Sequence, residues 1–262
     1  MAALRPLNLQ YRLMHQCDAE KWPRLARRLM VESRLSHDCF PLMRSVVLKP
    51  TIRCLRCHMP PRWCICGAHQ DIPCPLKITL LSHPRELIRP SSTGNLITRL
   101  FPDSRVYSWN SRQPPTVAEV AIPERELWIL HPHGRPAPAE AVASGVQVVL
   151  LDGLWNETAA MAREVGRWGR LVSLPMTGTS RYWLRAKQDG NRFSTAEALM
   201  FLLSSLDCNA ECESLRVQFE LHVYASLRSR GRTDLAAEFL AGSIIGAALP
   251  EFLAQLHTQR PL

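Results

Sequence analysis

The sequence predicts an α/β protein with a mostly parallel sheet, an N-terminal cysteine knuckle and a helical C-terminal part. Three observations support this prediction. Short apolar runs alternate with helical patterns between residues 78 and 175, four cysteines fall within residues 54–66, and only helical patterns follow Ser194. The chain has 262 residues, of which 46% are hydrophobic, so it has ample material for a folded core.

Residues 1–48 form a basic extension that we expect to be largely helical, because KWPRLARRLMVESRLS places its apolar residues at helical spacing. Either a helix packed on the domain or a free arm fits this pattern. Residues 1–75 carry 12 Lys and Arg against 5 Asp and Glu, whereas residues 76–262 carry 20 against 18. This one-sided charge favours a nucleic-acid partner. The preference for Arg over Lys could supply bidentate phosphate contacts, but an arginine-rich genome composition explains it better.

The knuckle, residues 49–75, has the pattern C-x2-C-x6-C-x-C. A C-x2-C turn lets two thiolates bind one ion, and a second pair completes a tetrahedron with no open position, so the spacing predicts structural zinc. Reduced, buried thiols are the alternative, and His58, His69 or Cys74 is able to replace one ligand. The predicted ligands are Cys54, Cys57, Cys64 and Cys66.

Residues 76–262 form the predicted catalytic domain. Its helical patterns include STAEALMFLLSS, where Ser194 and Glu197 form a capping box. The expected strands are 78–83, 105–109, 126–130, 146–153 and 171–175. The expected helical segments before Ser194 are 84–101 (after a loop), 136–145 and 155–168.

Polar clusters follow these strands, and ligands of parallel α/β sheets gather at the carboxyl ends of strands. In the first cluster, three polar residues recur at three-residue spacing, which would place them on one face of a helix. The hydroxyls and backbone amides that follow are suited to binding an anion. A solvated helix with its cap explains it equally well. Its residues are His83, Glu86, Arg89, Ser92, Thr93 and Gly94.

The second cluster contains Asp152 and Trp155. An Asp that ends a buried strand is partly desolvated, which suits a general base, although it also suits a helix cap. The third cluster is basic and aromatic, a combination that holds a phosphate and stacks on a base or simply packs in a core. It consists of Ser180, Tyr182 and Arg185, with Ser194 following.

In their order along the chain these motifs resemble the DTW-domain family of tRNA-uridine aminocarboxypropyltransferases. The resemblance covers about residues 50–205, through the cysteine knuckle, SHPRELIRPSSTGNL, LLDGLW, SLP…SRYWLR and STAEAL. Two positions depart from the family pattern. Leu154 stands where the family has the Thr of its name, and Ser92 stands where relatives often carry Asn.

The resemblance implies a SPOUT-like fold with a knotted cofactor loop. It also implies transfer of the 3-amino-3-carboxypropyl group of S-adenosylmethionine, the co-substrate, to N3 of a tRNA uridine, with release of methylthioadenosine. We expect Asp152 to take the N3 proton and Trp155 to shape the pocket. The residues expected to bind S-adenosylmethionine or the RNA backbone are His83, Glu86, Arg89, Ser92, Thr93, Gly94, Ser180, Tyr182, Arg185 and Ser194.

Two other functions remain open: an S-adenosylmethionine-dependent RNA methyltransferase on a related fold, and a non-catalytic zinc-containing RNA-binding protein. No apolar run approaches the roughly 18 residues that a membrane-spanning helix needs, and the N-terminus lacks a compact apolar stretch. We therefore expect a cytoplasmic protein that binds tRNA and no membrane.

Overall fold

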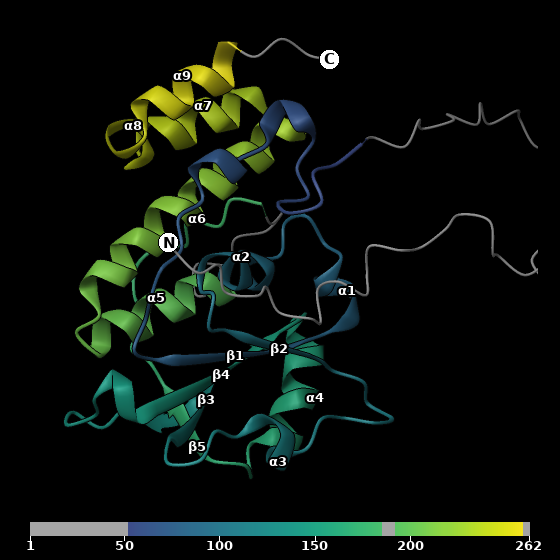
Figure 1. Cartoon of the computed structure of the whole chain (residues 1–262), viewed down its shortest axis with the longest axis vertical. Helices are drawn as coiled ribbons and strands as arrows, with labels where there is room; N and C mark the ends of the chain where they lie inside the picture. The colour runs from purple at the N-terminus through teal and green to yellow at the C-terminus, as the bar shows by residue number, and fades with distance from the viewer. Residues whose placement is uncertain (1–51, 185–191, 259–262) are drawn as a thin grey trace, which may run out of the picture. The chain divides into compact units, whose positions relative to one another are not determined.

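A parallel sheet forms the centre of the domain in the computed structural model, which describes residues 52–184 and 192–258 (Figure 1). Within these residues the five-stranded sheet has the order β2-β1-β4-β3-β5, and all its pairings are parallel. The predicted strands are thereby confirmed. They are β1 (Lys77–Ser82), β2 (Arg105–Ser108), β3 (Glu126–Pro136), β4 (Val146–Asp152) and β5 (Arg170–Ser173).

Helices cover both faces of the sheet. The α-helices are α1 (Pro84–Leu87), α2 (Thr93–Leu100), α3 (Val117–Val120), α4 (Trp155–Val165), α5 (Thr195–Ser205), α6 (Asn209–Ser229), α7 (Thr233–Ala241), α8 (Ile245–Ala248) and α9 (Pro250–Thr258). In Figure 1, α2, α5 and α6 lie on one side of the sheet, and α3 and α4 lie on the other. The short 3-10 helices are η3 (Pro61–Trp63), η4 (Cys66–Ala68) and η5 (Ala143–Gly145).

The two faces of the sheet have separate hydrophobic cores because successive side chains of a strand point to opposite sides. Leu80 of β1 and Leu150 of β4 belong to the larger core, with α2, α5 and α6. Leu81 and Val149 belong to the smaller core, where Met161 of α4 packs. The central strands are therefore apolar on both faces, as expected for a parallel sheet between two helical layers.

The prediction of a helix over 136–145 is wrong. This segment follows an extended β3 and contains only the short η5, because its prolines and alanines have no apolar stripe to bury. The short α3 is absent from the predicted elements, and β3 runs beyond residue 130 with an irregular pairing to β5. The basic extension, residues 1–48, lies outside the described residues.

The knuckle packs against the C-terminal helices. The Gln218 side chain of α6 donates a 2.7 Å hydrogen bond to the carbonyl of Ala68. The Arg62 guanidinium donates to the carbonyls of Leu256 and His257 at the end of α9. Both α6 and α9 therefore hold the knuckle. Among the described residues, none of the helices is both long and apolar enough to cross a membrane.

Candidate active site and metal centre

Asp152 lies at the carboxyl end of β4, and only 4% of its surface is exposed. Its Oδ1 accepts a 2.8 Å hydrogen bond from the Thr195 hydroxyl. Its Oδ2 lies 3.3 Å from the hydroxyl of Ser92 and 3.5 Å from that of Ser82. Burial raises the pKa of Asp152, and the three hydroxyls oppose that rise. The result is a shielded carboxylate held by side chains from β1, α2 and α5.

Gly94 allows the Asp152 carboxylate to lie against the first turn of α2. A methyl group at this position would lie 2.3 Å from Oδ2 of Asp152. Ser92 caps the same turn, since its hydroxyl accepts a hydrogen bond from the Asn95 amide. The unpaired amides at a helix N-terminus favour a nearby negative charge, so this contact opposes the rise in the pKa of Asp152 that burial causes.

Glu86 and Arg89 form an ion pair beside Asp152. The Glu86 side chain is buried, whereas the Arg89 side chain is 42% exposed. Burial raises the pKa of Glu86, the negative charge of Asp152 raises it further, and Arg89 lowers it. A buried carboxyl group and a reachable guanidinium therefore stand next to each other at this edge of the sheet.

His83 points to a different neighbour. The ring Nδ1 of His83 caps α1 by accepting a 3.3 Å hydrogen bond from the Arg85 amide, and Nε2 lies 3.4 Å from Glu157 Oε1. Because α1 ends at Leu87, the predicted shared face of His83, Glu86 and Arg89 reduces to the Glu86–Arg89 pair.

Glu197 organises most of the third cluster. Its carboxylate lies 3.0 Å from the Ser180 hydroxyl and accepts a 2.6 Å hydrogen bond from the Ser194 amide. The Ser194 hydroxyl in turn accepts from the Glu197 amide, so the predicted capping box is confirmed. Tyr182 donates a 2.7 Å hydrogen bond to the Ser91 carbonyl, beside Ser92. Arg185 lies outside the described residues.

Leu154 and Trp155 begin α4 directly after Asp152. Leu154 occupies the N-cap position, and its amide donates a 2.8 Å hydrogen bond to Glu157 Oε2. Leu154 is 46% exposed and Trp155 is 49% exposed. The guanidinium of Arg192 lies 5.8 Å from the centre of the Trp155 ring. Trp155 is therefore a half-exposed aromatic surface next to the buried carboxylate.

Two pockets meet at this point, and both are bordered by Gly153, Trp155 and Thr195. The apolar pocket encloses about 910 Å³ including the space at its mouth, and its apolar side chains include Leu130, Leu151, Val172, Leu174 and Met176. The polar pocket encloses about 1040 Å³, and its polar side chains include Glu86, Arg89, Ser92, Asp152, Arg192 and Arg230. The carboxyl edge of the sheet therefore offers one apolar and one polar compartment side by side.

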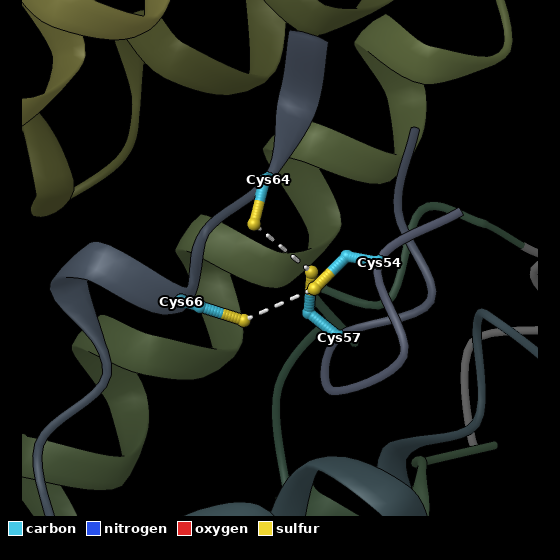
Figure 2. A group of neighbouring side chains, drawn as sticks. All are labelled: Cys54, Cys57, Cys64 and Cys66. Carbon is cyan, nitrogen blue, oxygen red and sulfur yellow. Dashed lines mark hydrogen bonds between the residues drawn. The ribbon is translucent and has the colours of Figure 1, made fainter. Parts of the chain in front are cut away.

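The four predicted cysteine ligands gather in the knuckle, and their sulfur atoms point toward one another (Figure 2). All four sulfurs lie within 4.8 Å of one another, with Cys54–Cys66 at 3.6 Å and Cys57–Cys64 at 3.7 Å. A zinc–sulfur bond of about 2.3 Å gives a tetrahedron with edges of about 3.8 Å, so the group fits one tetrahedral ion. His58, His69 and Cys74 are not members of the group.

A partly buried cation beside the thiols supports the same fit. Arg99, in the last turn of α2, donates a 3.4 Å hydrogen bond to the carbonyl of Arg56, which lies inside the C-x2-C turn. Its Nε and Nη2 atoms are buried and have no hydrogen-bond partner among the described residues. Burial lowers the pKa of Arg99, and negative charge on the Cys57 and Cys66 sulfurs opposes this effect. A divalent metal ion bound by four thiolates has a net negative charge, which would compensate the positive charge of this guanidinium.

Sequence patterns missed two partners of Asp152. Ser82 ends β1 and lies directly opposite Asp152 in the register of β1 and β4, and Thr195 opens α5 inside the STAEAL motif. Ser82 precedes His83 in the first polar cluster, so its position at a strand end was the available signal. The STAEAL motif was the signal for Thr195, but its contact with Asp152 arises only because tertiary packing brings α5 to the end of β4.

These features define a parallel α/β protein with a ligand site at the carboxyl edge of its sheet and a four-cysteine knuckle. The family model described as "DTW domain" matches residues 51–227, and the chain therefore belongs to the DTW domain family. Membership of this family supports a tRNA-modifying function. No solved structure matches the chain.

Proposed function

We propose that the protein is a tRNA-uridine aminocarboxypropyltransferase that uses S-adenosylmethionine as co-substrate. The observation that supports this most is the buried carboxylate of Asp152 at the junction of an apolar and a polar pocket. The SPOUT-like topology with a knotted cofactor loop belongs to the same proposal.

The two pockets match the two ends of S-adenosylmethionine. The apolar pocket suits the adenine and the methylthio group, and the polar pocket suits the charged amino-acid end and the uridine. The Glu86 carboxylate is suited to the ammonium of the transferred group, and Arg89 is suited to its carboxylate or to an RNA phosphate. Trp155 and Thr195 line both compartments.

The chemistry requires a proton acceptor and accurate positioning. Uridine N3 attacks the carbon of the aminocarboxypropyl chain next to the sulfonium, so the N3–C bond forms and the C–S bond breaks. The electron pair of the broken bond goes to sulfur, which leaves neutral methylthioadenosine, and the N3 proton goes to Asp152. The raised pKa of Asp152 suits this role, because a general base works best when its pKa lies closer to the working pH.

The target uridine has to be unpaired, because base pairing uses its N3 edge. We propose that the knuckle and the basic segment before it contact phosphates of the folded tRNA, since residues 1–75 hold most of the net charge. The knuckle then has a structural metal, held by Cys54, Cys57, Cys64 and Cys66.

The decisive experiment incubates the full-length protein with S-adenosylmethionine and unmodified tRNA, then measures the nucleosides and the small-molecule product by mass spectrometry. Methylthioadenosine together with aminocarboxypropyluridine supports the proposal. S-adenosylhomocysteine with a methylated nucleoside identifies a methyltransferase instead. Binding of tRNA without either product identifies a non-catalytic RNA-binding protein. Asp152→Asn serves as the control for turnover at this site.

A further inference from the structure

A third hollow is lined by Trp155 and other residues of α4, and Asp152 is not among its lining residues. We call it the α4 groove, and it encloses about 1140 Å³ including its open mouth. Trp155 is the residue that this groove shares with both the apolar and the polar pocket. The residues that line the groove are His131, Pro132, His133, Trp155, Ala159, Ala162, Arg163, Gly166, Arg167 and Leu171.

The α4 groove is basic and contains no acidic lining residue. Arg163 lies in the last turn of α4 and Arg167 follows four residues later, and both are exposed. Within residues 52–184 and 192–258, neither side chain has a hydrogen bond or an ion pair. By contrast, Arg170, just beyond them, is paired with Glu126 at 2.6 Å. Two uncompensated guanidinium groups therefore face solvent at one hollow.

We propose that the α4 groove binds the unpaired RNA nucleotide next to the target uridine. Arg163 and Arg167 contact its phosphates, and the exposed indole of Trp155 stacks on its base. Positive charge along a groove with an aromatic side chain at its end is the common arrangement for single-stranded nucleic acid, because every base has a stacking face. Since the RNA chain has to continue from the uridine in the polar pocket, the adjoining groove is its path.

This inference rests on the proposed function for the identity of the uridine site, but the groove itself is tested by binding alone. The probe is a fluorescein-labelled ten-residue oligouridylate, and binding to the full-length protein is followed by fluorescence anisotropy at several salt concentrations. The test variant is R163E/R167E. The matched control is R105E/R112E, which reverses the charge of two exposed arginines. Arg105 lies in β2, at the opposite edge of the sheet, and Arg112 lies in the turn after this strand.

We expect the dissociation constant of R163E/R167E to rise by roughly tenfold, and the slope of log Kd against log salt to fall by about 1.4, or about 0.7 for each lost phosphate contact. The control should bind within about twofold of the wild type. Equal binding by R163E/R167E and the wild type overturns the inference, and so does an equal loss in both variants. If R163E/R167E does not fold, R163Q/R167Q replaces it with the same expectation.

A purely structural role predicts a different result. Cations near a helix C-terminus stabilise the helix, so Arg163 would then affect thermal stability and leave oligouridylate affinity unchanged. The tRNA assay separates the two proposals. An unchanged KM for tRNA in R163E/R167E, with methylthioadenosine still formed, rejects the groove and keeps the function. RNA binding that depends on both arginines in a protein that forms no methylthioadenosine keeps the groove and rejects the function.

Discussion

A Cβ atom at Gly94 would lie 2.3 Å from Oδ2 of Asp152, which is closer than side-chain atoms approach one another. The first turn of α2 and the carboxylate at the end of β4 therefore fit only because position 94 has no side chain. Leu80 Cδ2 lies 3.0 Å from the same point, so the added methyl group has no free direction.

We expect Gly94→Ala to lower the free energy of unfolding by about 1–3 kcal/mol, as overpacking of a closed site does. It should also lower turnover, because Asp152 or α2 has to move. Thermal denaturation and the methylthioadenosine assay measure the two effects. Gly246→Ala in α8 is the matched control, since nothing lies within 4 Å of its Cβ position. Equal stability and activity in both variants would contradict the close contact.

Asp152→Asn should remove turnover and change how stability depends on pH. Because the folded-state pKa of Asp152 is raised, the folded protein keeps this proton to higher pH than the unfolded chain. Asp152 therefore lowers stability progressively as pH rises above its ordinary value of 3.8 through the folded value. The melting temperature of Asp152→Asn relative to the wild type should increase over that window.

Asp103→Asn provides a control of opposite sign. The hydrogen bond and charge of Lys77 lower the pKa of Asp103, so its contribution is present above 3.8 and is lost as pH falls. Its relative melting temperature should therefore decrease slightly with rising pH.

Full turnover in a folded Asp152→Asn protein that still binds S-adenosylmethionine would show that another group accepts the proton.

Leu154→Thr should stabilise the protein. Leu154 has an extended backbone at the N-cap of α4, and its amide already donates to the Glu157 carboxylate. A Thr hydroxyl would supply the other half of a capping box, a contribution of about 0.5–2 kcal/mol. We expect a higher melting temperature with turnover within about twofold of the wild type. Leu154→Ala should show no gain, and a large change in turnover would instead assign the hydroxyl a role in the reaction.

The knuckle should bind one zinc ion per chain. Cys57→Ser should lose the ion, measured by elemental analysis of the purified protein, and melt at a lower temperature, because the packing of the knuckle on α6 depends on it. Cys212→Ser is the control. This half-buried thiol donates a 3.4 Å hydrogen bond to the Met200 carbonyl and does not belong to the four-cysteine group. Retention of zinc by Cys57→Ser would exclude Cys57 as a ligand.

Arg99→Met should weaken zinc binding while leaving all four ligands in place. Substitution of a residue that supports metal ligands costs about 10–100-fold in metal affinity, and Arg99 is a partly buried cation next to the thiols. Competition with a chromogenic chelator at fixed pH measures the change. The control is Arg112→Met, which replaces an exposed arginine and should leave the zinc affinity unchanged. Equal affinities for both variants would show that Arg99 does not compensate the charge of the centre.

Local patterns were enough to predict the strands, the capping box at Ser194 and the grouping of the four cysteines, since each depends on residues close together in the chain. They failed over 136–145, where the composition suggested a helix although the segment has no apolar face to bury. The contact of Thr195 with Asp152 depends on the packing of α5 against β4, which no local pattern encodes. For the same reason, local patterns could not predict that α4 and β3 together line the α4 groove.

Helix α2 joins two sites through its opposite ends, with Gly94 against Asp152 and Arg99 beside the cysteines. One residue inserted between them would turn one end by about 100° and shift it by about 1.5 Å relative to the other. The two sites could not then both keep their contacts. The number of residues between Gly94 and Arg99 is therefore constrained as strongly as the residues themselves, and gaps between related sequences should fall outside this helix.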